Sequence, residues 1–310
     1  MSSPTITTTP RFVIRDQRRP SSDRSLPAGT RQRFPELAGP ARASFSSLAG
    51  LHTRPWLERL RRALRGGLFE LHYQPIVALH GGGGVSHHEA LVRLADEPGG
   101  ALVAPGAFLP AAERYGLVRE IDRLVVCRVA ALLARGNPSQ GNPSQGNASQ
   151  GVERVAVNVS ALSVTDGGML THIERQLARH GVDPARLVVE ITETAAISDM
   201  RRAKDFCDGV QALGCAIALD DFGVGFGSLY YAKRLPFRYL KIDGDFVRGL
   251  CASSEDRVMV RAIVDLARGM GRQTIAEYVG DEPTVRLLRE LGVDYAQGFQ
   301  IGRPRPLTAV

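Results

Sequence analysis

The chain has 310 residues, of which 44% are hydrophobic and 23% are charged, a composition typical of a soluble globular protein rather than a disordered one. No apolar run approaches the roughly 18 residues that a membrane span needs, so we expect no membrane partner. The net charge of +7 suggests nucleic acid, but residues 1–65 hold thirteen Arg against four acidic residues. That excess of nine leaves residues 66–310 with two net negative charges.

Residues 1–53 are predicted to be a disordered tail rich in Arg, Ser and Pro. They show no sustained apolar period, so they cannot bury enough surface to offset the entropy lost on ordering. The composition also resembles that of a transit peptide, but Asp16 and Asp23 count against that interpretation. We therefore expect a solvated tail and no nucleic-acid partner. The four cysteines are far apart and show no metal-ligand spacing, which favours free thiols and a cytoplasmic location.

Residues 54–67 open the folded part, with a helical pattern that places Trp56, Leu57, Leu60 and Leu64 on one face. Eight strand-like runs follow, at 69–79, 87–94, 154–160, 186–193, 216–222, 239–243, 273–279 and 295–301. Helical patterns separate most of them, at 105–116, 118–135, 201–213, 255–269 and 282–291. This alternation predicts an α/β fold of the (β/α)₈ barrel type, with a doubly wound open sheet as the alternative.

Two segments interrupt the alternation. Residues 136–151 repeat the five-residue pattern GNPSQ and are predicted to form a flexible surface loop with no assigned function. Residues 80–84 read HGGGG, and a glycine run can bind phosphate when it leads into a helix. Here it leads into a predicted strand, so we interpret it as a connecting loop.

Polar residues stand at or near the ends of six of these strands. In a barrel the strand ends converge on one mouth, where several carboxylates would repel one another unless cations neutralised them. Oxygen ligands without His or Cys point to Mg²⁺ or Mn²⁺, and an adjacent Asp pair can serve two ions. Two metals suit displacement at phosphorus, and a lysine nearby can orient a water, so the pattern indicates metal-dependent phosphoester hydrolysis. The residues are Glu89, Asn158, Glu190, Glu193, Asp220, Asp221, Lys241, Asp243 and Glu277.

Short motifs in a fixed order show a wider resemblance. Over roughly residues 55–305 the chain resembles the EAL family of cyclic di-GMP phosphodiesterases. Any one motif is weak evidence, but their order along a barrel-length pattern is specific. The motifs are Tyr73-Gln74-Pro75-Ile76-Val77, Glu89-Ala90-Leu91-Val92-Arg93, Asn158-Val159-Ser160, Glu190-Ile191-Thr192-Glu193, Asp220-Asp221-Phe222-Gly223, Lys241-Ile242-Asp243, Ala276-Glu277 and Gln297-Gly298-Phe299.

The resemblance implies a TIM-like barrel with an antiparallel first strand over residues 54–310, which would hydrolyse cyclic di-GMP to linear pGpG. It implies two Mg²⁺ or Mn²⁺ ions, and Ca²⁺ should inhibit because its coordination is larger and looser. One ion would be held by Glu89, Asn158, Glu190 and Asp220, and the other by Asp220, Asp221 and Glu277. The catalytic set would be Glu89, Lys241 and Glu277, with Lys241 contacting the nucleophilic water and Glu277 acting as a ligand rather than as a base.

The same resemblance implies further roles. The substrate would be contacted by Gln74, Leu91, Arg93, Asp243 and Gln297. Glu193 would anchor the loop after Asp221 and so couple the formation of a homodimer to metal binding. Apart from the resemblance, no second signalling domain fits within the first 53 residues, so we expect regulation through the tail, through dimerisation or from a separate regulatory protein.

Two departures from the family pattern concern loops. The usual DFGTGYSSL run has Val224 in place of its Thr and Gly227 in place of a Ser, and the usual AEGVE run reads Ala276-Glu277-Tyr278-Val279-Gly280. These substitutions are expected to affect the dynamics of the two loops and the rate of hydrolysis rather than the ability to catalyse it. The alternative function is a catalytically silent cyclic di-GMP receptor or protein-interaction module. Silent members tend to lose a metal ligand, whereas this chain keeps every predicted one.

Overall fold

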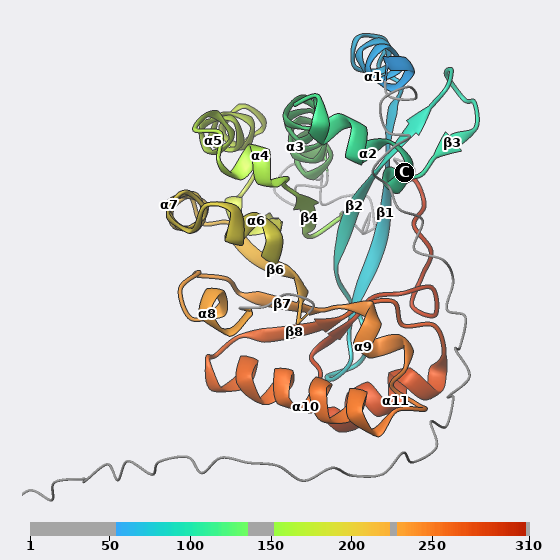
Figure 1. The fold of residues 1–310 in the computed structure, drawn as a ribbon, viewed down its shortest axis with the longest axis vertical. Helices are drawn as coiled ribbons and strands as arrows, with labels where there is room; N and C mark the ends of the chain where they lie inside the picture. The colour runs from blue at the N-terminus through green and yellow to red at the C-terminus, as the bar shows by residue number, and fades with distance from the viewer. Residues whose placement is uncertain (1–53, 136–151, 224–227, 308–310) are drawn as a thin grey trace, which may run out of the picture. The chain divides into compact units, whose positions relative to one another are not determined.

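A computed structural model describes residues 54–135, 152–223 and 228–307 of the chain (Figure 1). The predicted tail 1–53, the loop 136–151 and the departures at Val224 and Gly227 lie outside the described residues. Eight strands form a closed barrel, which confirms the predicted fold class. They are β1 (Phe69–Ala78), β2 (Val85–Ala95), β4 (Val155–Asn158), β5 (Leu187–Thr192), β6 (Ala216–Phe222), β7 (Tyr239–Ile242), β8 (Gln273–Ala276) and β9 (Tyr295–Ala296).

The first strand runs against the rest of the barrel. β1 pairs antiparallel with both β2 and β9, while every other neighbouring pair in the barrel is parallel. The connection between β1 and β2 is too short for a crossover helix, so these strands can pair only as a hairpin. Because β1 closes the ring between β2 and β9, the open-sheet alternative is excluded. A short strand, β3 (Leu102–Val103), extends β2 outside the ring.

Helices surround the strands on the outside of the barrel (Figure 1). The first, α1, carries the predicted apolar face, on which Leu60 is fully buried and Trp56, Leu57 and Leu64 pack against the core. All five predicted later helices are present, and α5 and five shorter helices, η2 among them, were not predicted. The helices are α1 (Arg54–Gly66), α2 (Pro105–Arg114), α3 (Val118–Arg135), α4 (Ala161–Val164), α5 (Gly168–His180), η2 (Pro184–Arg186), α6 (Glu193–Ser198), α7 (Met200–Ala212), α8 (Ser228–Ala232), α9 (Gly244–Arg248), α10 (Ser254–Gly269) and α11 (Glu282–Leu291).

Several strands end earlier than the apolar runs suggest, because capping residues start a helix there. The side chains of Ser160, Thr192 and Asp243 accept backbone N–H hydrogen bonds in the first turns of α4, α6 and α9. As a result Glu193 is the first residue of α6. Strand β8 also ends early, and Glu277 lies just past its end. Both were predicted inside strands.

The barrel interior is built in layers, because alternate strand residues point inward. One layer is apolar and closely packed, formed by Ile76, Ala156, Val188, Ala218, Tyr239 and Ile275. Two residues further toward the mouth, the same strands carry a polar layer: Gln74, Asn158, Glu190, Asp220, Lys241 and Glu277. The apolar layer therefore forms a solid floor beneath the polar residues at the mouth.

Candidate active site

Lys241 lies at the centre of the polar layer and is 1% exposed. Its Nζ is 2.8 Å from Glu190 Oε2, 2.9 Å from Glu277 Oε1, 3.1 Å from Asp220 Oδ1 and 3.7 Å from Glu89 Oε2. These side chains come from five strands: β2, β5, β6, β7 and the residue just after β8. One buried ammonium group thus faces four carboxylates, which leaves an excess of negative charge at the mouth.

Glu89 is fixed by two amide side chains. Asn158 Nδ2 donates to Glu89 Oε1 at 2.6 Å, and Gln297 Nε2 donates to Glu89 Oε2 at 2.6 Å. The same Gln297 nitrogen lies 3.2 Å from Gln74 Oε1, and Gln74 Nε2 donates to the Gly302 carbonyl at 3.0 Å. Both oxygens of Glu89 are therefore held in place, and its carboxylate plane is fixed toward the cavity.

Asp220, Asp221 and Glu277 form a second group, with one ligand atom of each within 4.8 Å of the others. Asp220 Oδ1 accepts the backbone N–H of Asp221 at 3.0 Å, and Asp221 itself is exposed with φ at 55°. The left-handed backbone of Asp221 interrupts the pairing of β6 with β7, whose register shifts between Leu219 and Phe222. This local distortion places two consecutive carboxylates at one strand end.

Burial changes the protonation of these groups. It raises the pKa of Glu277 to about 8 and that of Asp221 to about 6, in each case against the opposing effect of Lys241. Burial also raises the pKa of the fully buried Glu190 well above its usual value. For Lys241, burial alone would lower the pKa, but the surrounding carboxylates raise it well above its ordinary range. Lys241 is therefore charged, and Glu277 and Glu190 bind protons more tightly than exposed glutamates do.

A cavity of about 430 Å³ opens above this cluster. Four of the five predicted substrate-binding residues, Gln74, Leu91, Arg93 and Gln297, line it. The fifth, Asp243, is not among the lining residues, and its carboxylate accepts the backbone N–H of Asp245 at 2.7 Å at the start of α9. The full lining is Gln74, Glu89, Leu91, Arg93, Asp220, Asp221, Lys241, Glu277, Tyr278, Gly280, Gln297, Gly298, Phe299 and Pro304.

The cavity lining includes residues that the sequence did not single out for a role. Tyr278 and Phe299 are both 60% exposed, and each has an arginine over its ring. Tyr278 could have been identified from the sequence, because it replaces the glycine of the usual AEGVE motif. Gly280, where the family run has a second acid, also lines the cavity, so the described wall carries one carboxylate fewer.

Glu193 is buried at the first position of α6. The loop that it is predicted to anchor includes residues 224–227, which lie outside the described residues. Its anchoring role therefore stays a prediction.

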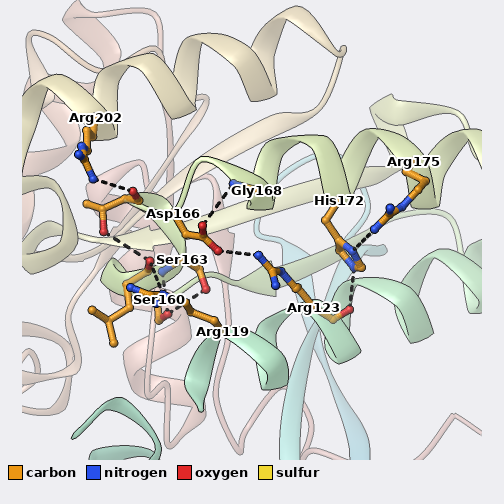
Figure 2. A network of polar contacts seen from close by, with 11 residues as sticks. Arg119, Arg123, Ser160, Ser163, Asp166, Gly168, His172, Arg175 and Arg202 are labelled. Atoms are coloured by element: carbon orange, nitrogen blue, oxygen red, sulfur yellow. Dashed lines mark hydrogen bonds and ion pairs between the residues drawn. The ribbon is translucent and has the colours of Figure 1, made fainter. Parts of the chain in front are cut away.

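Asn158 is supported from outside the barrel. The backbone N–H of Ser160, two residues later, donates to the buried carboxylate of Asp122 on α3 at 3.0 Å. Figure 2 shows the polar network that continues from Ser160 and Ser163 to Asp166, whose carboxylate accepts from Arg123 at 2.6 Å. Helices α3, α4 and α5 are thereby joined behind the strand end that presents Asn158.

Comparison with known proteins identifies the family. The family described as EAL domain matches residues 57–304. The cyclic di-GMP phosphodiesterase PdeB of Shewanella oneidensis is 36% identical over 82% of this chain and 28% of its own length. The bifunctional diguanylate cyclase/cyclic di-GMP phosphodiesterase MucR of Pseudomonas aeruginosa is 38% identical over 81% of this chain and 35% of its own. The chain thus spans about a third of the length of these curated relatives.

Solved structures agree with this match. The PaMucR phosphodiesterase in complex with c-di-GMP superposes with a TM-score of 0.72 at 35% identity, covering 81% of this chain and 98% of that one. The EAL domain of Xanthomonas citri FimX in complex with c-diGMP gives a TM-score of 0.73 at 30% identity, covering 83% of this chain and 96% of that one.

Within the described ranges, no helix is both long and apolar enough to cross a membrane.

Proposed function

The chain belongs to the EAL domain family, and we propose that its cavity binds cyclic di-GMP and hydrolyses one phosphodiester bond to give linear pGpG. The names of its relatives supply the substrate class. The observation that carries the proposal is the cluster of four carboxylates within 3.7 Å of the buried Lys241 ammonium at the base of the cavity. Such a cluster needs further cations before an anionic dinucleotide can approach it.

Two Mg²⁺ or Mn²⁺ ions fit the residues present. Glu190 Oε1 is buried with no hydrogen-bond partner among the described residues, so it has a lone pair available for a cation. The Asp220, Asp221 and Glu277 group supplies closely spaced oxygens, and hard oxygen donors suit these metals. We assign Glu89, Asn158, Glu190 and Asp220 to one ion, and Asp220, Asp221 and Glu277 to the other. When bound, the ions lower the pKa of a water and stabilise charge on the leaving oxygen.

The side chains then bind and orient the reactants. Lys241, 2.9 Å from Glu277 and 3.1 Å from Asp220, places its ammonium where it can donate to the attacking water. The water oxygen forms a bond to phosphorus as the water gives up a proton, the bond to the 3′ oxygen breaks, and that oxygen takes up a proton and leaves as a hydroxyl. Arg93 is suited to bidentate contact with a phosphate. Gln74 and Gln297 contribute amides at the cavity floor and Leu91 an apolar wall, and Asp243 remains a proposed substrate contact.

A turnover assay tests this function. Purified chain is incubated with cyclic di-GMP in Mg²⁺, Mn²⁺, Ca²⁺ or EDTA, and pGpG is separated by chromatography. We expect product in Mg²⁺ and Mn²⁺ only, and none from Glu89→Ala or Asp220→Ala. Glu290→Ala, which removes an exposed carboxylate on α11, serves as the matched control and should leave the rate unchanged. Binding of the dinucleotide in Mg²⁺ without turnover would assign the silent receptor role instead. A homodimer, a separate regulatory protein and a cytoplasmic location stay predictions from the sequence.

A further inference from the structure

Tyr278 lines the cavity with its backbone in the left-handed region, at φ 55°. Among the described residues, Asp221 is the other non-glycine residue with positive φ, and it lines the same cavity. A bulky L-residue is disfavoured in this conformation, and such strain tends to collect at functional sites. The usual AEGVE run has glycine at this position. This chain therefore keeps a strained tyrosine where glycine would be relaxed.

Hydrogen bonds on both sides of Tyr278 impose its backbone conformation. The N–H of Glu277 donates to the Ile242 carbonyl at 3.2 Å, and the N–H of Val279 donates to the Gln297 carbonyl at 3.0 Å. The Val279 carbonyl accepts the N–H of Gln300 at 3.1 Å. The two neighbouring peptides are thus tied to β7 and to the segment after β9, and the side chain of Tyr278 has a fixed starting direction.

Helix α9 supports the ring. A Cβ on Gly244, the first residue of α9, would lie 2.3 Å from a Tyr278 ring carbon, so only glycine leaves room for the ring there. One turn later, the Arg248 guanidinium lies 4.5 Å from the ring centroid, within cation–π range. With these supports the side chain is still 60% exposed. A flat aromatic surface is therefore held rigidly at the wall of the cavity.

We propose that Tyr278 stacks against a guanine base of the bound cyclic dinucleotide, with Gly244 and Arg248 holding its ring in position; this rests on the proposed function. A rigid exposed ring offers base-stacking surface at little entropic cost, and stacking on an aromatic side chain is a common way to bind nucleobases. The hydrolytic groups lie at the cavity floor and are not part of this contact. Tyr278 should therefore govern affinity rather than the chemical step.

The test compares three variants of the full chain. Tyr278→Gly removes the ring and relieves the backbone, Tyr278→Phe keeps the ring, and Tyr230→Ala is the matched control. Tyr230 is also exposed and has Arg234 over its ring, but it is not among the residues that line the cavity. The Kd for cyclic di-GMP is measured calorimetrically in Ca²⁺, and KM and kcat are measured in Mg²⁺.

We expect Tyr278→Gly to raise Kd and KM about tenfold with kcat within about twofold of the wild type, and Tyr278→Phe to restore both. The thermal midpoint of Tyr278→Gly should not fall, because glycine relaxes the left-handed backbone, so weaker binding cannot reflect unfolding. If Tyr278→Gly keeps wild-type affinity, or if Tyr230→Ala loses as much affinity as Tyr278→Gly, the stacking role of Tyr278 is wrong, while the proposed function is unaffected. A wild-type chain that neither binds nor cleaves cyclic di-GMP would overturn the proposed function together with it.

Discussion

At the residue scale, Lys241 has a role that is separate from any contact with water. It is a buried cation within 3.1 Å of Glu190, Asp220 and Glu277, so it offsets charge that the apolar floor cannot solvate. Removing one partner of a buried ion pair leaves the other uncompensated, which is far more costly than losing a surface pair. The stability of the metal-free protein should therefore depend on this one side chain.

Lys241→Met is expected to lower the free energy of unfolding by about 3 kcal/mol in EDTA, because several buried carboxylates lose their counter-ion. Mg²⁺ should recover part of that loss by supplying positive charge to the same oxygens. Urea unfolding of both proteins, with and without Mg²⁺, measures the difference. Lys233→Met, at an exposed lysine, is the control and should change little. An equal loss with and without Mg²⁺ would contradict the counter-ion role.

The raised pKa of Glu277 makes a second prediction, for the metal-free chain. Burial raises this pKa to about 8 from an unfolded value near 4.5, so between these values the folded state holds a proton that the unfolded chain has lost. The stabilisation is complete below the unfolded pKa and is lost as the pH rises through 8. His87, whose pKa burial lowers to about 3, acts in the opposite direction but only below about pH 6.5.

Unfolding in EDTA between pH 6.5 and 8.5 separates the two effects. We expect the free energy of unfolding to fall with rising pH, by up to about 1.4 kcal/mol per pH unit from Glu277. Glu277→Gln should reduce this slope, and the remaining slope should come from Glu190, whose pKa is also raised. If the variant keeps the full wild-type slope, Glu277 does not carry a proton in the folded state.

The site residues differed in how far the sequence could predict them. Glu89, Glu190, Asp220 and Lys241 stood out because each is a polar residue inside an apolar strand pattern, and closure of the barrel then brought them together. Tyr278 gave no such pattern, since an exposed aromatic residue after a strand has no periodicity; its only signal was that it replaces the glycine of the AEGVE run. Its placement depends on Gly244 and Arg248 of another segment, which only the folded chain brings near.

At the element scale, the long helices and the strands were predictable and the short helices were not. Helix α3 has eighteen residues, enough for its apolar period to be recognised, whereas α4 and α9 have four and five, little more than one turn each. Helix α5 has a regular apolar stripe of Met169, Ile173 and Leu177, so its helical period was present in the sequence but was not recognised. The predicted strands extended too far, because Ser160 and Thr192 cap helices although they stand in sequence runs that are otherwise strand-like.

Arg186 joins the two ends of the segment predicted to be a flexible loop, residues 136–151. Its guanidinium donates to the carbonyls of Leu133 at 2.9 Å, Val152 at 2.6 Å and Glu153 at 2.9 Å. The last turn of α3 and the approach to β4 therefore meet at one side chain.

Replacing residues 136–151 with a short Gly-Ser linker should leave turnover intact and raise stability by about 1 kcal/mol or less, because closing a shorter loop costs less entropy. Arg186→Ala should instead lower stability by about 2 kcal/mol, since it removes donors from several carbonyls. Thermal unfolding and the turnover assay check both. If excision costs as much as Arg186→Ala, the repeats must pack against the barrel, which the composition does not predict.

At the scale of the whole molecule, opposite charges are segregated along the chain. The net charge of +7 includes eight arginines against three acidic residues within residues 1–53, whereas the mouth of the barrel collects carboxylates. Net charge alone therefore does not reveal the acidic mouth, because the positive excess lies at the other end of the sequence. Under the proposed function, Lys241 and divalent metal would neutralise the mouth for an anionic dinucleotide, and the excess of arginine elsewhere would not be needed.

Deleting residues 1–53 tests that separation, since it removes a positive excess of five while leaving every cavity residue in place. We expect kcat/KM for cyclic di-GMP to stay within about twofold and the thermal midpoint to stay unchanged, because the predicted tail contributes neither core nor ligand. Retention on heparin should weaken, since it depends on net positive charge. The assay is run at low and at high salt. A drop in kcat/KM confined to low salt would mean that the arginines steer the dinucleotide toward the mouth. If the full chain retains DNA in a salt-dependent way and the shortened chain does not, the tail binds nucleic acid.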